Sequence, residues 1–345
     1  MNELQIYDMS SIVHTGATGM QTNFYGVPVG GIQYFLKHLA VAIKDRDSVV
    51  PCFDSPSFRM DLMQDYKSGR MRDPRIYHQI EVLYDSLRAC GVKCEKYDGY
   101  EADDLIEWAV TENREKFIRG VTIYSSDHDI CHSIRDGVMQ RTLRSDMSDV
   151  MPSNFETAIK RGERIPYNTI SAYKVFIGCE SDSIPAFVSE AGLKGRQLYS
   201  VWCESLRRIG NLSSRNLGAN PDSVRAFAKS VKAFTERDMQ EIERRIKLVF
   251  PADRPDGVSI VPTPWSDIDL GKLGFLCSKY NARDALRCLG IKPSDLSEED
   301  KNALRSEARA LSTGEYAVDK NLQHETRSVK SSLLDLDSFS RGFTG

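Results

Sequence analysis

The chain has 345 residues, of which 41% are hydrophobic and 28% charged, so it can bury a core sufficient for one large domain or two ordinary ones. Its formal net charge of -3 excludes binding to nucleic acid through overall positive charge, although local basic patches remain available for it. The eight cysteines lack the spacing of a zinc site, the first residues do not resemble a signal peptide, and no apolar run approaches the roughly 20 residues of a membrane span. We therefore expect reduced thiols and a soluble, cytoplasmic protein without a membrane partner.

Strand-like and helix-like segments alternate through the first half of the chain. Short apolar runs predict strands, and apolar residues at every third or fourth position predict helices. We expect strands at 4–8, 48–54, 92–97 and 120–127, and helices at 29–45, 74–91 and 101–117. This alternation is typical of an α/β fold with a mostly parallel central sheet flanked by helices.

The second half of the chain is mainly helical. We expect helices at 167–178, 188–210, 222–249, 271–290 and 297–311, with a proline-rich connector at 251–265. The pattern divides the chain into an α/β core at 1–165, a helical region at 166–312 and a polar, flexible tail at 313–345.

Acidic residues follow several of the predicted strands. Asp8, Asp54 and Asp127 each end a strand, and Glu101 begins the helix after another. In a parallel sheet the carboxyl ends of the strands meet at one edge, where ligands bind. Four separate segments are therefore expected to bring carboxylates to the same edge of the sheet.

Carboxylates at this density repel one another, so a folded cluster of them needs a cation. Asp103 and Asp104 have a simpler explanation, because acids in the first turn of a helix interact favourably with the helix dipole. That explanation does not extend to Asp129, Glu180 and Asp182, which lie at other predicted turns. Oxygen ligands favour Mg²⁺ or Mn²⁺, and a pool of this size is suited to holding two divalent ions for in-line attack on a phosphodiester.

Four sequence motifs occur in order between residues 3 and 200. They are FDSPSFRMDLMQDYKSGR (53–70), GYEADDLI (99–106), YSSDHDI (124–130) and AYKVFIGCESDSIP (172–185). Together they resemble the 5′-nuclease superfamily, which includes the bacteriophage 5′–3′ exonucleases and RNase H, the 5′-nuclease domain of bacterial DNA polymerase I and the flap endonucleases. The resemblance implies a phosphodiester hydrolase with two Mg²⁺ ions, for which Mn²⁺ substitutes. Its substrates would be DNA and RNA–DNA duplexes with 5′ ends or flaps, in replication or repair, and a phage member would act in the host cytoplasm.

The resemblance also implies roles for the acidic residues. The predicted ligands are Asp8, Asp54, Glu101 and Asp103 for a first metal, and Asp127, Asp129 and Asp182 for a second. Asp104 would lie between the two metal sites or support the first. The chain departs from the family at Cys179, where a metal-binding aspartate is expected, and a thiol is a poor ligand for Mg²⁺. The second metal is therefore expected to bind more weakly or to be shared.

Several basic residues lie between the second strand and the helix at 74–91. They are Arg59, Lys67, Arg70, Arg72 and Arg75. One interpretation is a solvated helical face. The resemblance instead implies an arch at about 55–80 over the metals, in which Lys67 and Arg70 act with Asp103 as the catalytic residues, and Arg59 and Arg72 bind substrate. Tyr66 would either stack on a base or anchor the core.

Two further segments suggest binding surfaces. Ser181–Gly195, between two predicted helices, resembles the family's helix–turn–helix clamp on duplex DNA, with Lys194 and Arg196 supplying charge. In the tail, Leu333–Phe339 would insert into a groove of a sliding clamp or single-strand-binding protein, or pack as a last helical turn on the same chain.

Two other functions remain open at this point. A PIN-type endoribonuclease uses fewer acids and lacks both the Tyr-Lys-x-x-Arg segment and the helical clamp, so the sequence favours it less. A binding protein that holds branched DNA without cutting it is supported by Cys179 alone.

Overall fold

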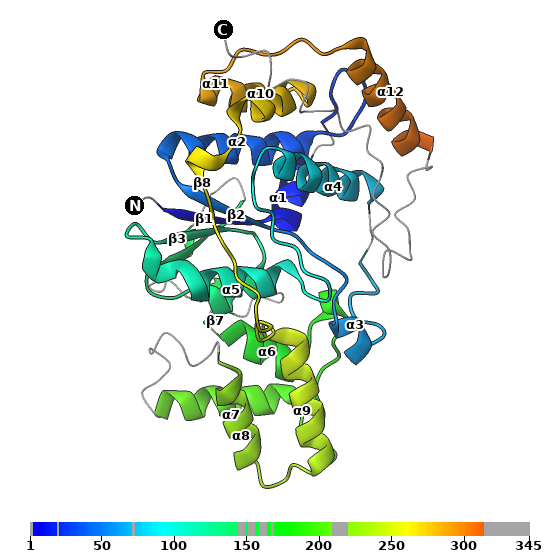
Figure 1. Cartoon of the computed structure of the whole chain (residues 1–345). Helices are drawn as coiled ribbons and strands as arrows, with labels where there is room; N and C mark the ends of the chain where they lie inside the picture. The colour runs from blue at the N-terminus through cyan, green and yellow to red at the C-terminus, as the bar shows by residue number, and fades with distance from the viewer. Residues whose placement is uncertain are drawn as a thin grey trace.

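The computed structural model describes residues 3–18, 21–70, 73–143, 149–150, 156–158, 164–166, 169–208 and 220–313. Its centre is a sheet with the strand order β5-β4-β3-β1-β2-β8. Figure 1 labels β1, β2, β3 and β8 of this sheet. The parallel strands are β1 (Leu4–Asp8), β2 (Ser48–Cys52), β3 (Val121–Tyr124) and β4 (Val138–Arg141). The edge strands β5 (Asp149–Val150) and β8 (Thr263–Pro264) run antiparallel to their neighbours. The predicted mostly parallel sheet flanked by helices is confirmed.

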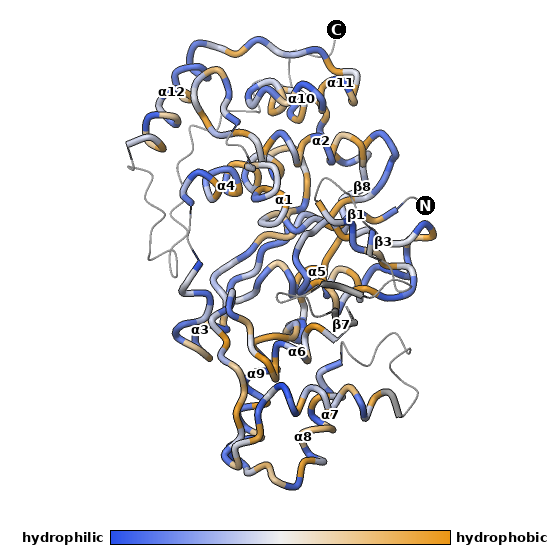
Figure 2. Tube along the Cα trace, turned by 180° about the vertical axis from the view of Figure 1, so that it is seen from behind, coloured by the Kyte–Doolittle hydropathy of each residue, from blue (hydrophilic) through white to orange (hydrophobic). Residues whose placement is uncertain are grey.

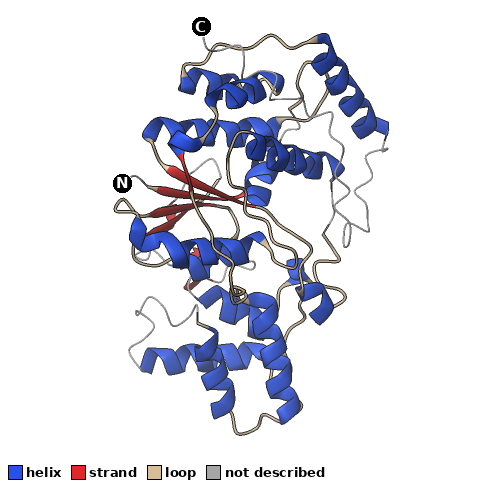
Figure 3. Cartoon of the chain, viewed as in Figure 1, coloured by secondary structure: helices blue, strands red, loops and turns tan. Residues whose placement is uncertain are grey.

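The central strand β1 is buried along its whole length because helices cover both faces of the sheet. Alternate side chains of a strand point to opposite faces. Leu4 and Ile6 pack with α5 (Ala102–Asn113) on one face, whereas Tyr7 packs with α1 (Met9–Gly16), α2 (Gly30–Asp45) and α4 (Pro74–Ala89) on the other. Figure 3 shows the strands as a single layer between these two sets of helices.

The helical second half of the chain contributes to both ends of the molecule. Helices α6 (Ile170–Ile177), α7 (Gly195–Arg208), α8 (Pro221–Ser230) and α9 (Glu236–Val249) form one apolar cluster below α5 (Figure 1). Helices α10 (Leu270–Lys279), α11 (Arg283–Leu289) and α12 (Glu298–Thr313) share a core with α2 and α4 at the opposite end. The boundary at residue 165 stays a prediction, but the region 166–312 does not form a single layer.

Hydropathy follows this packing. Seen from behind, α12 alternates between hydrophilic and hydrophobic segments, as expected for a helix with one covered face (Figure 2). Its Leu304 is fully buried in the core shared with α2. None of the helices in the described part of the chain is both long and apolar enough to cross a lipid bilayer.

Three predicted elements differ from those in the structure. The strand expected at 92–97 is reduced to one bridge between Cys52 and Glu95, because Pro51 offers no N–H and β8 occupies the rest of that edge. The helix expected at 222–249 is two helices, since Thr235 begins a new one with a capping box to Asp238. The stretch at 271–290 is likewise divided into α10 and α11.

The helix expected at 188–210 begins only at Gly195. Residues before it form a turn in which Val188 pairs with Lys194. Gly195 approaches α6 so closely that a Cβ atom there would lie 1.9 Å from the carbonyl oxygen of Phe176. Helices α6 and α7 are therefore joined by tight turns, and their use as a DNA clamp stays a prediction. Short elements that the sequence patterns did not indicate are α1, α3 (Arg59–Leu62), β4, β5 and the two-stranded pair of β6 (Glu156–Ala158) and β7 (Arg164–Pro166).

Candidate active site

The predicted acids do meet at the carboxyl edge of the parallel strands. Asp8 is the last residue of β1, Asp54 follows β2 by two residues, and Asp127 follows β3 by three. Glu101 is the residue that precedes α5, whose first turn holds Asp103. The parallel topology thus accounts for the convergence of segments that are far apart in the sequence.

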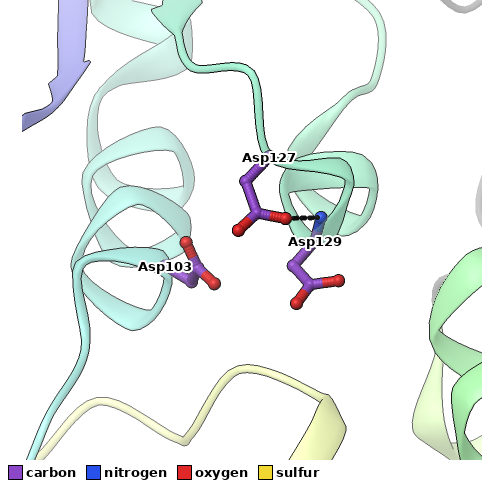
Figure 4. Close-up of side chains that lie close together, drawn as sticks. All are labelled: Asp103, Asp127 and Asp129. Carbon is purple, nitrogen blue, oxygen red and sulfur yellow. Dashed lines mark hydrogen bonds between the residues drawn. The ribbon is translucent and has the colours of Figure 1, made fainter. Parts of the chain in front are cut away.

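Asp103, Asp127 and Asp129 form the tightest acidic cluster among the described residues (Figure 4). Each offers one carboxylate oxygen, and these three atoms all lie within 4.8 Å of one another. Asp127 also accepts a hydrogen bond from the backbone N–H of Asp129 at 3.0 Å, which fixes the turn. Burial and the neighbouring carboxylates raise the pKa of Asp103 well above its ordinary value, and burial with Asp129 raises the pKa of Asp127. The cluster thus combines one predicted ligand of the first metal with two of the second.

Asp8 and Asp54 lie at this edge next to the strands and bind neighbouring segments through hydrogen bonds. Asp8 accepts hydrogen bonds from the N–H of Ser11 at 3.0 Å and the hydroxyl of Ser125 at 2.7 Å, so it links β1, α1 and β3. Burial, and then the nearby charge of Asp54, raises its pKa to about 7. Asp54 is exposed and accepts a hydrogen bond from the N–H of Ala102 at 2.9 Å.

Lys67 and Glu101 form an ion pair at the base of the predicted arch. The Tyr66 hydroxyl donates to the same carboxylate at 3.0 Å, and its ring is only 5% exposed. Tyr66 therefore anchors the core, and the alternative role of stacking on a base is not supported. Lys67 has a φ of 55°, which is rare for a residue with a side chain, and its N–H donates to the carbonyl of Asp182 at 3.2 Å. Its backbone is thus held in a strained conformation at the site.

Lys174 is a cation that sequence reasoning missed. Its ammonium donates to Asp129 at 2.6 Å and to Asp182 at 3.1 Å, while Arg70 binds the other oxygen of Asp182 at 2.7 Å. Burial alone would lower the pKa of Lys174, but Asp129 and Asp182 raise it well above its usual value. Burial would raise the pKa of Asp182, yet Lys174 and the other cations hold it below its ordinary value. The available signal was a single lysine within the otherwise apolar helix ISAYKVFI.

Arg59 and Asp104 differ from their predicted roles. The two side chains form a bidentate ion pair with both N–O distances at 2.8 Å, and Asp104 is fully buried. The remaining lone pairs of Asp104 accept from the N–H groups of Glu101 and Ala252. A carboxylate with every lone pair occupied is not free to bind metal, and a guanidinium that is 3% exposed is not open to substrate. Direct metal binding by Asp104 and substrate binding by Arg59 are therefore corrected to a structural role, and support of the first metal site by Asp104 stays a prediction.

The other predicted residues are not part of the cluster of Asp103, Asp127 and Asp129 or lie outside the described residues. Cys179 is half-buried and hydrogen-bonds with the Ser181 hydroxyl, and Glu180 is exposed. Lys194 and Arg196 are exposed at the turn before α7 and at its start. Arg72 and Leu333–Phe339 lie outside the described residues.

The raised pKa of Asp8 predicts that the metal-free protein loses stability as pH rises. The folded state retains a proton on Asp8 up to about pH 7, whereas the unfolded chain releases it near 3.8. The folded state therefore binds more protons across this window, and its free energy of unfolding falls as pH increases through it. Thermal melts in EDTA, recorded at intervals from about pH 4.5 to about pH 7.5, should show this decline. Asp8→Asn should make this decline shallower, and a melting temperature that rises steadily over the same range for the wild type would contradict the expectation.

Comparison with known proteins agrees with this description. Residues 4–160 match the family described as 5′-3′ exonuclease, N-terminal resolvase-like domain. The 5′-3′ exonuclease of Bacillus subtilis (strain 168) is 28% identical over 205 residues, which cover 56% of this chain and 66% of that protein. The 5′-3′ exonuclease of Aquifex aeolicus (strain VF5) is 26% identical over 261 residues, or 73% of this chain and 88% of the relative. The resemblance to the 5′-nuclease superfamily is thereby confirmed.

A solved structure of the bacteriophage T5 5′-exonuclease with bound zinc is also similar. It is 14% identical to this chain, with a TM-score of 0.45 over 90% of this chain and 99% of that one.

Proposed function

We propose that this protein is a phosphodiester hydrolase, a Mg²⁺-dependent 5′-nuclease that acts on DNA and RNA–DNA near 5′ ends or flaps in the cytoplasm. The observation that carries the proposal is the cluster of Asp103, Asp127 and Asp129 at the carboxyl edge of the sheet, beside Lys67 and Arg70. Acids that crowd at a ligand-binding edge, with cations beside them, are suited to a metal-assisted reaction of a phosphate. The names of the relatives support the same reaction class.

The donor atoms fit Mg²⁺ or Mn²⁺, because the cluster offers only carboxylate oxygens. When all groups at this edge are ionised, seven carboxylates face three cationic side chains. Two divalent ions would balance the negative charge that remains. The carboxylates are those of Asp8, Asp54, Glu101, Asp103, Asp127, Asp129 and Asp182, and the cations are Lys67, Arg70 and Lys174. When bound, divalent ions supply an activated water and stabilise the leaving oxygen.

Lys67 and Arg70 are proposed to hold the scissile phosphate. Their partners at present are the carboxylates of Glu101 and Asp182. A phosphate that enters this edge offers oxygen acceptors of the same kind, so the ammonium and guanidinium groups can transfer to it. There they orient the phosphorus for in-line attack and stabilise the charge that develops on its oxygens.

The helical region is proposed to bind the duplex. Lys194 lies exposed in the turn before α7, and Arg196 lies exposed at the start of α7. The segment that joins α7 to α6, the helix of Lys174, also carries Asp182. Contacts from such a turn to backbone phosphates would position the substrate without reading its sequence. A sliding clamp or single-strand-binding protein remains the proposed partner of Leu333–Phe339.

A non-catalytic protein that binds branched DNA is the second candidate. It is favoured by Asp182, which is already bound by Arg70 and Lys174, and by a thiol at Cys179. A PIN-type endoribonuclease is less favoured, because the segment with Tyr66 and Lys67 reaches the acids and contributes contacts to them.

Cleavage of two matched substrates tests the proposal. A 5′-labelled flap and an RNA-primed duplex of the same sequence are incubated with the full chain in Mg²⁺, in Mn²⁺ and in EDTA. We expect products from the 5′ end or flap junction in either metal and none in EDTA. Tight binding without cleavage would favour the branched-DNA binder, and metal-dependent cutting of single-stranded RNA with no preference for 5′ ends would favour the endoribonuclease.

A further inference from the structure

The guanidinium of Arg59 uses all five of its N–H donors inside the protein. Two bind the carboxylate of Asp104, and one makes a longer contact of 3.4 Å with the Ser57 hydroxyl. The other two bind the carbonyl oxygens of Leu248 at 3.2 Å and Phe250 at 3.0 Å, at the end of α9. The carbonyls at a helix C-terminus have no partner within the helix, and a buried cation there also complements the helix dipole. Arg59 thus ties the end of α9 to the start of α5.

A second arginine ties the same segment to the other side of the site. Arg245 is 3% exposed and donates to the carbonyls of Val175 at 3.2 Å and Pro185 at 2.7 Å. Val175 lies in the last turn of α6, directly after Lys174, and Pro185 closes the turn that carries Asp182. Arg245 therefore fixes the position of α6 and of this turn relative to α9.

Residues 245–252, which we call the α9 strap, thus contact both acid-bearing parts of the site. At the α5 end, the N–H of Ala252 donates to Asp104 at 2.8 Å, and the Trp108 indole donates to the carbonyl of Ala252 at 2.8 Å. Asp104 is the neighbour of Asp103 and also holds the N–H of Glu101 at 3.0 Å. At the α6 end, Arg245 holds the segments that contribute Lys174 and Asp182.

We infer that the α9 strap sets the separation between the acids of α5 and those bound by Lys174, with Arg59 and Arg245 as positioning residues. Ile246 and Phe250 of the strap belong to the apolar cluster of α6–α9, the region proposed to bind duplex. The inference therefore rests on the proposed function for its effect on cleavage, although its effect on metal affinity is independent of it. A shift of the contacts made by Arg59 or by Arg245 would change the distances among the carboxylates of Asp103, Asp127 and Asp129. It would also change the distance between Asp129 and Lys174.

Arg59→Lys is the variant that tests this inference. Lysine keeps the charge but presents a single ammonium, so it cannot bind Asp104 and the two α9 carbonyls together. Groups that orient metal ligands typically cost about 10–100-fold in metal affinity or activity when they are changed. We expect losses of that size in Mn²⁺ affinity, measured by electron paramagnetic resonance of free Mn²⁺, and in kcat on the labelled flap. The affinity for uncut flap, measured in EDTA, should stay near that of the wild type.

Arg225→Lys is the matched control. Arg225 also binds a carboxylate through two nitrogens, that of Glu243 on α9, but at a partly exposed surface and through a residue that precedes the strap. It should leave Mn²⁺ affinity and kcat unchanged. If Arg59→Lys fails to fold, Arg245→Gln provides the same readings from the other end of the strap.

The outcomes separate this inference from the proposed function. Wild-type Mn²⁺ affinity and kcat in the folded Arg59→Lys and Arg245→Gln variants would overturn it, even if their melting temperatures fall, because a merely structural role predicts that result. If the wild type cleaves neither substrate but a variant binds Mn²⁺ more weakly than the wild type does, the inference is supported and the proposed nuclease function is rejected.

Discussion

Asp103→Asn is expected to reduce metal-dependent cleavage by about 10²–10³-fold or more. Asp103 contributes one of the three carboxylate oxygens that lie within 4.8 Å of one another, and asparagine keeps its shape while it removes the charge. The same substitution should not destabilise the metal-free protein. Because burial, and then the charges of Asp127 and Asp129, raise the pKa of Asp103, its ionised form is unfavourable in the fold, and a neutral amide removes that cost.

Rates and melts measured together test both parts of this expectation. Initial rates of flap cleavage should fall in Asp103→Asn, its affinity for the flap in EDTA should persist, and its melting temperature in EDTA should equal or exceed that of the wild type. Asp98→Asn is the matched control, since Asp98 is exposed and lies on the same approach to α5. Cleavage that persists in Asp103→Asn would show that the acidic cluster is not the catalytic metal site.

The acids at the sheet edge could be predicted because each depends on local pattern and on one topological rule. Asp8 is the last residue of an apolar strand, and Asp54 and Asp127 follow theirs within three residues. Parallel strands then bring such residues together whatever the length of the intervening chain. The composition of the tightest cluster could not be obtained in this way. Asp103 joins Asp127 and Asp129 because of how α5 is placed, which depends on packing from distant segments.

Arg59 and Asp104 show the limit of sequence reasoning most clearly. Both stand in motifs that resemble a nuclease site, and nothing in the residues themselves distinguishes a metal ligand from half of a buried ion pair. The difference depends on the carbonyls of Leu248 and Phe250, which accept hydrogen bonds from Arg59, and on the N–H of Ala252, which donates to Asp104. These residues follow Asp104 by nearly 150 positions in the sequence. The missing strand at 92–97 has a similar cause, because the edge that it would extend is shared with β8.

Lys174→Met is expected to weaken both the metal-free fold and catalysis. Lys174 is bound by Asp129 and Asp182, and its side chain is 15% exposed while that of Asp182 is 4% exposed. Removing one member of a buried ionic group costs about 3–5 kcal/mol, because its partners keep uncompensated charge. We expect a loss near the lower end of that range, since Asp129 is partly open to water and Arg70 still binds Asp182.

Divalent ions should restore more stability to Lys174→Met than they add to the wild type. The substitution leaves Asp129 and Asp182 without their shared ammonium, and carboxylates that have lost a shared cation attract Mg²⁺ or Mn²⁺. Melting temperatures with and without Mg²⁺ should therefore differ more in the variant, whereas Lys292→Met, which removes an exposed lysine, should behave as the wild type does. An equal response to Mg²⁺ in both would mean that Asp129 and Asp182 do not share one cation position. A larger response with a flap-cleavage rate still well below that of the wild type would instead show that the ammonium aligns these acids in a way that the metal does not reproduce. That role in alignment would then account for the presence of a lysine in a mainly apolar helix.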